Sequence, residues 1–459
     1  MRPTATQPGR VGVAGGLTGY DDAAALDRGV AQALAEAGLS AAGETPFARI
    51  VPRGASVLLK PNWVYHCNES GQGNDCLNTH AALIAAVARA VAHCGPSRII
   101  VGDSPIQGCT LEDIAGAGFA QRLASGAAAA GMTGPVEVRD LRKVRMVPAG
   151  LGAPRAATPR TDADYILFDL GADSLLEEIS RPAGRFRVTM YDPRALARTH
   201  HPGRHQYVLA REAFEADVVI NLPKLKTHRK AGITNALKNL VGLNGNKDYL
   251  PHHRVGGSWT GGDCYAGFDP LRRAAEWCLD RANQEAGTPA YRLWRGRADR
   301  LLGWNRRLGR GTDVEGGWHG NDTCWRMSLD LNRVLLYGRL DGSIADEPQR
   351  RIISVVDAVI AGQAEGPLAP EPLLLGLVLA GDDSPAIDTV GAALLGLDPA
   401  RIPIVRRAFD DFRWRLTATP IDAVRAFRNG APAEPAALAA RLGRRALCPQ
   451  GWRGAIEAA

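Results

Sequence analysis

The sequence predicts an α/β fold with a mostly parallel sheet and helices on both of its faces. Short apolar segments alternate with segments of helical character, and polar residues or glycines directly follow most of the apolar segments. Strands that alternate with helices favour a parallel sheet that is buried on both sides. The chain has 459 residues, 45% of them hydrophobic, which suits one large α/β domain with insertions or two domains.

The expected elements follow in chain order. We expect strands at residues 56–59, 98–101, 216–220, 352–356 and 373–380. A helix is expected at 80–93 with Thr79 as its N-cap, and another at 233–241, ending near Gly242. Residues 362–367 (GQAEGP) are expected to form a flexible loop.

These elements divide the chain into three regions. Residues 1–250 and 326–410 are predicted to form the α/β core. Residues 251–325 carry six of the nine tryptophans together with many arginines and glycine pairs, and predict an insertion that caps the site or forms a contact between subunits of a homo-oligomer. Residues 411–459, rich in alanine, arginine and proline, predict a helical C-terminal tail.

Composition narrows the class of protein. The sequence has no run of eighteen apolar residues, so a membrane-spanning helix is not expected. The N-terminal sequence lacks the apolar core of a signal peptide, and a cytoplasmic location is therefore expected. The net charge is +7, but the basic residues are scattered without interleaved aromatic residues, which disfavours nucleic acid as a partner. A locally positive pocket for an anionic substrate fits the charge better.

Lysine is scarce in this chain and concentrated in one segment. Of 55 basic residues only seven are lysines, and five of these lie between positions 224 and 247. A solvated surface would accept arginine, as the rest of the chain does. A lysine supplies a compact ammonium that shifts its pKa on burial and meets a phosphate or carboxylate as a point charge. The segment 221–245, NLPKLKTHRKAGITNALKNLVGLNG, is therefore predicted to be the functional centre.

Polar residues that follow the predicted strands are expected to gather at one edge of the sheet, where open α/β sheets bind ligands. These residues are Lys60, Asn62, Asp103, Ser104, Lys224, Lys226, Asp357 and Asp382. A capping or turn role for Asp103 is an equal alternative. Glu365, in the predicted loop, is a candidate acid or base.

Within the lysine-rich segment, Lys224, Lys226 and His228 are the candidate catalytic residues. Lys224 and Lys226 point the same way if the chain stays extended, and His228 is available for proton transfer. Lys238 and Asn239 are expected to bind substrate from the following helix, with Asn235 one turn before them. The alternative is a basic surface connection between a strand and a helix.

A second polar stretch, KDYLPHHR followed by a glycine-rich loop, contributes Arg254 as a substrate-binding candidate and a potential metal site. His252, His253 and Asp263 could hold a divalent metal, although their spacing matches no diagnostic motif, whereas His200 and His201 are expected to be ordinary turn histidines. The eight cysteines include no CxxC pair, so no ferredoxin-type iron–sulfur cluster is encoded, and free thiols are expected. The cofactor is otherwise unknown.

Seven ordered motifs carry a family resemblance: LLKPN, VGDSP, ADVVINLPKLKTH, TNALKNLVG, DLNR, VVDAVIAGQAEGP and LAGDDSPAIDTVGAALLG. Over most of its length the chain resembles the domain-of-unknown-function family 362. The resemblance implies an α/β fold and a site at the motif residues, but little chemistry. Many relatives are described as iron–sulfur proteins because they carry an added ferredoxin-like module, which this chain lacks.

The leading functional hypothesis is an enzyme that acts by acid/base chemistry on a small metabolite bearing a phosphate or carboxylate, within a biosynthetic pathway. Two alternatives stay open. One is a metal- or iron–sulfur-dependent redox protein, and the other is a non-catalytic anion-binding protein. The number of titratable groups beside glycine-rich loops favours the enzyme.

Overall fold

The structure is a computed structural model that describes residues 9–41, 43–146 and 155–458. Residues 1–8 lie outside the described residues. They are the start of the N-terminal segment in which the sequence predicts no signal peptide. Among the described residues, eleven strands form one large sheet. They are β1 (Arg10–Gly15), β2 (Ser56–Pro61), β3 (Arg98–Asp103), β4 (Val136–Asp140), β11 (Val218–Leu222), β12 (Lys224–His228), β13 (Gly232–Thr234), β15 (Ile352–Glu365), β16 (Ala369–Gly381), β17 (Arg425–Arg428) and β18 (Ala431–Ala433).

The sheet is mostly parallel, as the sequence predicts. Its order is β18-β17-β1-β16-β15-β11-β2-β3-β4, and β12 pairs with β15 and β13 beside this path. Strands β15, β11, β2, β3 and β4 run parallel to one another, whereas β16 runs antiparallel to both β15 and β1. The parallel strands therefore end at one common edge, and β16 ends at the opposite edge.

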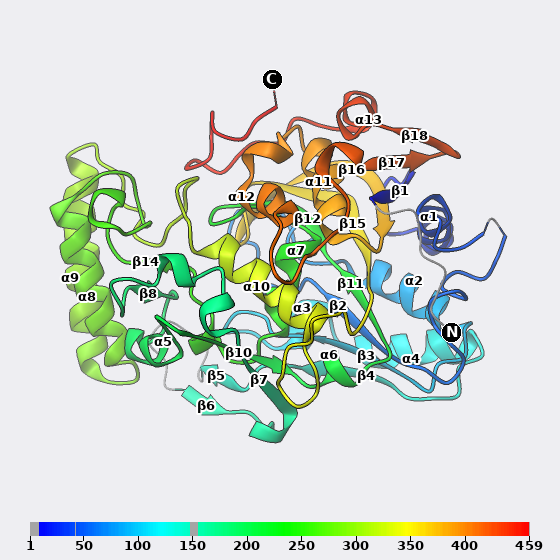
Figure 1. The fold of residues 1–459 in the computed structure, drawn as a ribbon, viewed down its shortest axis with the longest axis horizontal. Coiled ribbons are helices and arrows are strands. Elements are labelled where there is room, and N and C mark those ends of the chain that lie inside the picture. The colour runs from blue at the N-terminus through cyan, green and yellow to red at the C-terminus, as the bar shows by residue number, and fades with distance from the viewer. Residues whose placement is uncertain (1–8, 42, 147–154, 459) are drawn as a thin grey trace.

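Helices cover both faces of the sheet (Figure 1). On one face, α1 (Ala23–Glu36), α2 (Ala81–Ala92) and α4 (Phe119–Ala129) pack against alternate residues of the strands, such as Val57 and Leu59. The other face packs against α7 (Ala236–Asn239), α10 (Cys324–Tyr337), α11 (Ser384–Leu394) and α12 (Pro403–Arg406). Because successive strand residues point to opposite faces, Leu58 and Ile100 belong to this second core.

A small sheet completes the second core. Strands β7 (Tyr165–Asp169), β10 (Arg204–Ala210) and β9 (His200–His201) pair antiparallel and pack with Leu58 and Ile100. Two further pairs join β5 (Val144–Met146) to β6 (Arg155–Ala157) and β8 (Phe186–Arg187) to β14 (His253–Arg254). The remaining helices are α3 (Leu111–Ala115), α5 (Pro193–Thr199), α6 (Glu212–Glu215), α8 (Pro270–Gln284), α9 (Pro289–Arg307) and α13 (Pro435–Leu442).

The predicted insertion, residues 251–325, contains the helices α8 and α9. Helices α8 and α9 lie side by side at the left edge of Figure 1, away from the large sheet. None of the helices in the described part of the chain is both long and apolar enough to cross a lipid bilayer.

Four local predictions differ from the structure. The N-cap of α2 is His80, because Thr79 instead donates to the Leu222 carbonyl at 2.6 Å. The helix expected at 233–241 is divided between strand β13, the short helix α7 and a 3₁₀ turn. Residues 362–365 continue strand β15, which pairs with β16 up to Glu365. The tail is not wholly helical, because β17 and β18 extend the large sheet before α13.

Candidate functional site

A cavity of about 340 Å³ lies beyond the carboxyl ends of the parallel strands. Strand β2 supplies Lys60, β3 supplies Asp103, β12 supplies Lys226 and His228, and α7 supplies Lys238. The polar residues that line it are Lys60, Asn62, Glu69, Asp103, Ser104, Gln107, Thr189, Tyr191, Lys226, His228, Arg229, Lys230, Thr234, Lys238, Asn239, Lys247, His252, Glu315 and Glu365. We call this space the lysine cavity, because five of the seven lysines of the chain line it.

Lys60 and Asp103 form a fully buried ion pair at the floor of the lysine cavity. The Lys60 Nζ lies 2.8 Å from Asp103 Oδ1, and it also donates to the Pro61 carbonyl at 2.6 Å. Asp103 accepts hydrogen bonds from the backbone N–H groups of Trp63 and Ser104, both at 2.7 Å. Burial lowers the pKa of Lys60 and raises the pKa of Asp103, while each charge favours the ionised form of the other. The pair fixes the ends of β2 and β3 relative to each other.

Asn239 and Gly242 hold this pair in place. Asn239 donates to the Lys60 carbonyl at 3.1 Å and to Asn221 Oδ1 at 2.7 Å, and it accepts from Lys60 Nζ at 3.3 Å. A Cβ atom at position 242 would lie 2.0 Å from Asp103 Oδ1 and 2.8 Å from Lys60 Nζ. Only glycine therefore lets the backbone approach the ion pair this closely.

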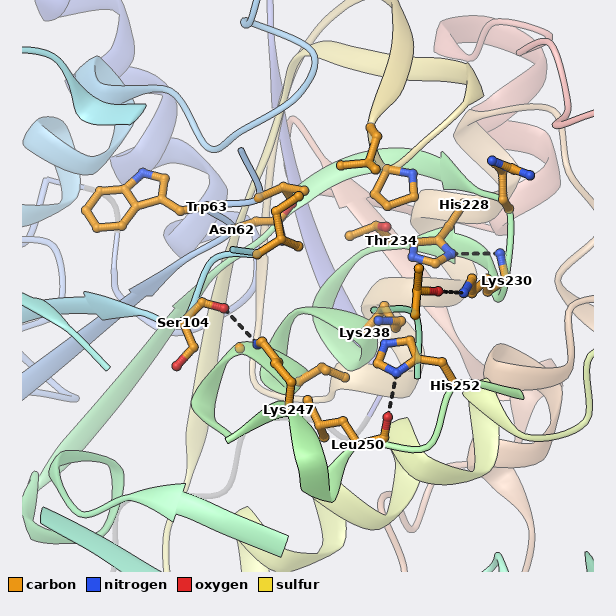
Figure 2. Close-up of a pocket in the computed structure, with 18 of the residues that line it drawn as sticks. Asn62, Trp63, Ser104, His228, Lys230, Thr234, Lys238, Lys247, Leu250 and His252 are labelled. Atoms are coloured by element: carbon orange, nitrogen blue, oxygen red, sulfur yellow. Dashed lines mark hydrogen bonds between the residues drawn. The ribbon is translucent and has the colours of Figure 1, made fainter. Parts of the chain in front are cut away.

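Three other lysines of the cavity lack an acidic partner. Among the described residues, no carboxylate lies within salt-bridge distance of Lys226, Lys238 or Lys247. Lys226 donates to the Leu77 carbonyl, and Lys247 donates to the Ser104 carbonyl at 2.9 Å (Figure 2). Lys238 has no hydrogen-bond or ion-pair partner in the described part of the chain. The cavity thus contains three buried ammonium groups that form no salt bridge among the described residues, and Asp103 favours the charged forms of Lys226 and Lys247 only from beyond that distance.

Burial makes these ammonium groups easy to deprotonate. Loss of solvation, together with the neighbouring Lys224 charge, lowers the pKa of Lys226 to about 7. Loss of solvation likewise lowers the pKa of Lys247 to about 7, and lowers that of Lys238 from its usual value. Such groups regain a full charge when an anion approaches, because an opposite charge favours the ionised form.

Two histidines face the same cavity in different tautomers. His228 Nδ1 accepts the backbone N–H of Lys230 at 3.0 Å and that of Ala231 at 3.2 Å, so the proton of the neutral ring lies on Nε2. His252 Nδ1 lies 2.7 Å from the Leu250 carbonyl, which can only accept, so the proton lies on Nδ1 and Nε2 keeps its lone pair.

Both rings are held neutral. Burial lowers the pKa of His228 well below its usual value, and the Lys238 and Lys226 charges add to this effect. Burial, Lys238 and Lys230 act in the same way on His252. Figure 2 shows both histidines beside Lys238. The cavity therefore contains a neutral hydrogen-bond donor and a neutral base, together with positive charge.

Several buried oxygen atoms that belong to cavity residues have no partner within the described structure. They are Asn62 Oδ1, Ser104 Oγ and Thr234 Oγ1. A buried polar atom without a hydrogen bond is destabilising, so such atoms in a cavity commonly receive a ligand or water. An apolar wall of Trp63, Val64, Ile106, Val188, Met190, Leu250 and Leu368 completes the lining.

The structure brings together ten of the residues predicted for the site. These are Lys60, Asn62, Asp103, Ser104, Lys226, His228, Lys238, Asn239, His252 and Glu365. Glu365, at the end of β15, lies 3.4 Å from Arg229 at the partly exposed side of the cavity. His252, which was predicted as a metal ligand, is one of the residues that line the cavity.

Lys224, predicted to be catalytic, is not part of the lining. It is fully buried and lies 2.8 Å from Asp357 Oδ2, and it donates to the Tyr20 hydroxyl at 2.8 Å. The strand irregularity between Lys224 and Lys226 explains why the two residues have different surroundings, although a regular strand would place them on one face. Lys224 therefore supports the base of the strand that carries Lys226.

Asp382 lies elsewhere because β16 is antiparallel to β15. Gly381 pairs with Ser354 near the start of β15, so Asp382 is at the opposite edge of the sheet, where it contacts Arg351. Asn235 is also outside the lining, since its side chain donates to the Ile387 carbonyl at 3.2 Å. Arg254 lies 3.6 Å from Asp263, away from the lining.

The predicted metal ligands do not form one group. Asp263 accepts from the Thr323 hydroxyl at 2.6 Å and pairs with Arg254, while His253 belongs to the short strand β14. Within the described residues, no three His, Cys, Asp or Glu side chains are placed so as to hold a metal ion. All eight cysteines, each within the described ranges, are free thiols.

Sequence reasoning omitted several cavity residues. Lys230 belongs to the lysine-rich segment 221–245 and Lys247 lies two residues beyond it, so the clustering of lysines already indicated both. Trp63 and Thr234 adjoin the predicted residues Asn62 and Asn235. Glu315, 3.8 Å from Lys230, comes from the insertion and has no signal in the sequence.

Comparisons with known proteins identify relatives of this chain. It is 26% identical over 229 residues to a thylakoid-associated protein of Synechocystis sp., and this match covers 50% of the chain and 46% of that protein. The chain thus spans about half the length of this curated relative. A crystal structure of a protein from Thermotoga maritima, 11% identical, matches 78% of the chain and 56% of that protein with a TM-score of 0.30, which is too low to support an argument.

The family comparison is more extensive. The model of the domain of unknown function DUF362 matches residues 57–168 and 156–393. These ranges include every residue that lines the lysine cavity, and they confirm the family resemblance of the motifs. Because the match covers well over half of its length, the chain belongs to the DUF362 family.

Proposed function

We propose that this protein is an enzyme that binds a small organic phosphate or carboxylate in the lysine cavity and acts on it by proton transfer. The single observation that supports the proposal best is the group of three buried lysines without acidic partners. A buried, unpaired charge is destabilising, so folds retain one where a ligand compensates it. An anion between Lys226, Lys238 and Lys247 would restore their charges and form charge-assisted hydrogen bonds.

The uncharged part of the ligand is expected to match the neutral polar atoms and the apolar residues of the lining. Asn62 Oδ1, Ser104 Oγ and Thr234 Oγ1 suit hydroxyl or amino groups of the substrate, because these substituents can donate or accept hydrogen bonds. The apolar wall around Trp63 and Leu250 suits a short carbon skeleton. A hydroxylated organic anion fits both features better than an inorganic ion alone.

Proton transfer is assigned to the two histidines. His252 Nε2 carries a lone pair and would accept a proton from the substrate, whereas His228 Nε2–H would donate a hydrogen bond to an oxygen that gains negative charge. Lys226, with a pKa of about 7, is suited to return a proton near neutral pH. An anionic substrate would also raise the pKa of His252 by offsetting the lysine charges.

A binding titration tests the first half of the proposal. Calorimetry with citrate and with inorganic phosphate should show saturable binding, and Lys238→Met should weaken it by about 10- to 100-fold, the worth of one charge-assisted hydrogen bond. Lys143→Met is the matched control, since Lys143 lies outside the cavity and should leave the affinity unchanged. Equal affinities of the Lys238→Met variant and the parent protein would refute the anion site.

A turnover screen tests the second half. The protein is incubated with a panel of phosphorylated and carboxylated metabolites, and products are followed by mass spectrometry. His252→Gln and Lys226→Arg should abolish conversion while retaining the fold. Tight binding with no conversion of any panel member would favour a non-catalytic anion-binding protein. The cytoplasmic location expected from the sequence is part of this proposal and is tested by fractionation of source cells.

A further inference from the structure

Exposed hydrophobic side chains are concentrated on the helical insertion, away from the lysine cavity. Among the described residues, ten large hydrophobic side chains are exposed, and six of them lie between residues 259 and 308. They are Trp259, Phe268, Trp277, Leu293, Trp304 and Leu308, with exposed fractions from 47% to 83%. Isolated exposed apolar residues need no explanation, but a concentration of this kind indicates a contact surface.

Helical spacing arranges three of these residues, Trp277, Leu293 and Trp304, in two stripes together with exposed arginines. On α8, the exposed residues Arg273, Trp277 and Arg281 recur at intervals of four. On α9, Leu293, Arg297, Arg300, Trp304 and Arg307 recur at intervals of three or four. Each stripe therefore occupies one side of its helix.

The two stripes adjoin each other. Trp277 and Trp294 make an edge-to-face contact with their ring centroids 5.2 Å apart. The helices run antiparallel, since Asn305 near the end of α9 donates to Asp269 before α8 at 2.8 Å. The contact between Trp277 and Trp294 thus connects the α8 stripe to α9. We call the surface formed by the two stripes the Trp/Arg face.

Four of the five arginines of the Trp/Arg face lack an acidic partner among the described residues, whereas Arg273 lies 3.6 Å from Glu276 on α8. Within the described structure, Arg281, Arg297, Arg300 and Arg307 form no salt bridge, although Arg295 on another side of α9 pairs with Asp299 at 3.2 Å. Arg281 and Arg297 instead lie over the Trp277 and Trp294 rings, at 5.3 and 4.4 Å from their centroids. The two stripes contain no Asp or Glu. The surface therefore carries unneutralised positive charge next to exposed indole and leucine side chains.

This composition identifies the partner by its chemistry. Arginines reach anionic headgroups, while Trp and Leu enter the boundary between headgroups and acyl chains, so a helix face of this kind lies on a membrane surface. A second copy of the face would oppose arginine with arginine, which disfavours self-association. Nucleic acid would use the arginines and indoles, but it gives the exposed leucines nothing to contact.

We propose that the Trp/Arg face of α8 and α9 docks the protein on the surface of a membrane that contains anionic lipids. The surface is separate from the lysine cavity, so docking does not depend on the proposed enzymatic function. The insertion also supplies His252 and Glu315 to the cavity, so the docking surface and part of the cavity lining belong to the same region of the chain.

Vesicle flotation of the full chain tests the proposal. The protein should float with vesicles made of equal parts of phosphatidylcholine and phosphatidylglycerol, and should stay at the bottom with vesicles of phosphatidylcholine alone. High salt should release it, because exposed charges are screened. The variant Arg281→Gln/Arg297→Gln/Arg300→Gln/Arg307→Gln should lower the partition coefficient about tenfold or more.

A matched variant removes the same number of charges elsewhere. Arg53, Arg406, Arg441 and Arg445 are exposed and lie outside the insertion, so their replacement by Gln should leave partitioning within about twofold of the parent protein. Trp304→Ser, which keeps all charges, should also weaken flotation. Circular dichroism confirms folding of each variant.

Three results would overturn the proposal. The first is absence of flotation with phosphatidylglycerol vesicles at low salt. The second is an equal loss of vesicle binding in the Trp/Arg-face variant and the matched variant, which would show that only the net charge of the protein matters. The third is binding to single-stranded RNA or self-association in light scattering, lost in the Trp/Arg-face variant, with no flotation of the parent protein.

Discussion

His228 and His252 line one cavity with opposite ring nitrogens protonated. His228 Nδ1 accepts two backbone N–H groups, and His252 Nδ1 donates to the Leu250 carbonyl at 2.7 Å. One histidine therefore presents a donor and the other a lone pair, although both rings are neutral. This difference arises from backbone hydrogen bonds and is invisible in the sequence, where both are merely histidines near lysines.

Nitrogen NMR can detect these tautomers directly. In long-range proton–nitrogen spectra at neutral pH, His228 should give the pattern of an Nε2–H ring and His252 that of an Nδ1–H ring. His228→Gln and His252→Gln variants assign the two signals. Both patterns should persist at pH 6.5, the usual pKa of a histidine, because burial and nearby lysines keep the pKa values of both rings well below it. The same tautomer in both rings, or protonation at pH 6.5, would contradict the division of roles.

Anion affinity should fall as the pH rises above 7. Burial lowers the pKa of Lys226 and Lys247 to about 7, so both are charged in the free protein only below that value. A bound anion favours the charged form, so above pH 7 binding must take up protons, and affinity falls by up to about tenfold per pH unit for each lysine that titrates. Calorimetry with citrate at pH 8 in two buffers of different ionisation enthalpy measures this uptake.

The Lys226→Met variant provides the control for this pH dependence. It should show a smaller proton uptake and a shallower fall in affinity than the parent protein. An affinity that is constant from pH 6 to pH 9, with no proton uptake at pH 8, would show that the lysines are not the titrating groups.

Removing one partner of the buried Lys224–Asp357 pair should destabilise the fold. Both side chains are fully buried, and Asp357→Asn leaves the Lys224 ammonium without its charge partner. The free energy of unfolding should fall by about 3 to 5 kcal/mol, measured by urea denaturation. The exposed pair Arg295–Asp299 is the reference, and Asp299→Asn should change stability by less than about 1 kcal/mol. Equal small effects would mean that the Lys224 pair has no structural role.

Gly242 should tolerate no side chain. Its Cβ would lie 2.0 Å from Asp103 Oδ1, so Gly242→Ala must displace the Lys60–Asp103 pair and the end of β3. We expect a lower melting temperature and weaker binding of citrate. Gly296→Ala within α9 is the matched change, because a Cβ there meets nothing within 4 Å, and alanine favours a helix by about 1 kcal/mol. A melting temperature of Gly242→Ala equal to that of the parent would contradict the close packing.

The sequence predicted the location of the site better than its individual contacts. Lysines were the informative residues, because a chain that otherwise uses arginine retains lysine where a compact ammonium is needed, and five of the seven do line the cavity. The parallel strands were likewise readable from apolar segments that end in polar residues. These features depend on local pattern.

Other features depend on long-range pairing and were missed. Asp382 follows an apolar strand just as Asp103 does, but β16 pairs antiparallel with β15, so its end lies at the opposite edge. The irregularity that separates Lys224 from Lys226 depends on pairing with β15. Glu315 reaches the cavity only because the insertion folds back on the core. A single sequence contains no signal for any of these contacts.

The central claim is that Lys226, Lys238 and Lys247 together hold an anion, and anomalous diffraction tests it most directly. Crystals of the protein at pH 6.5, where the lysines are charged, are soaked in selenate and measured at the selenium edge. We expect an anomalous peak inside the lysine cavity within hydrogen-bond distance of at least two of these ammonium groups, and no peak there in Lys238→Met crystals. Peaks confined to surface arginines, with an unchanged empty cavity, would contradict it.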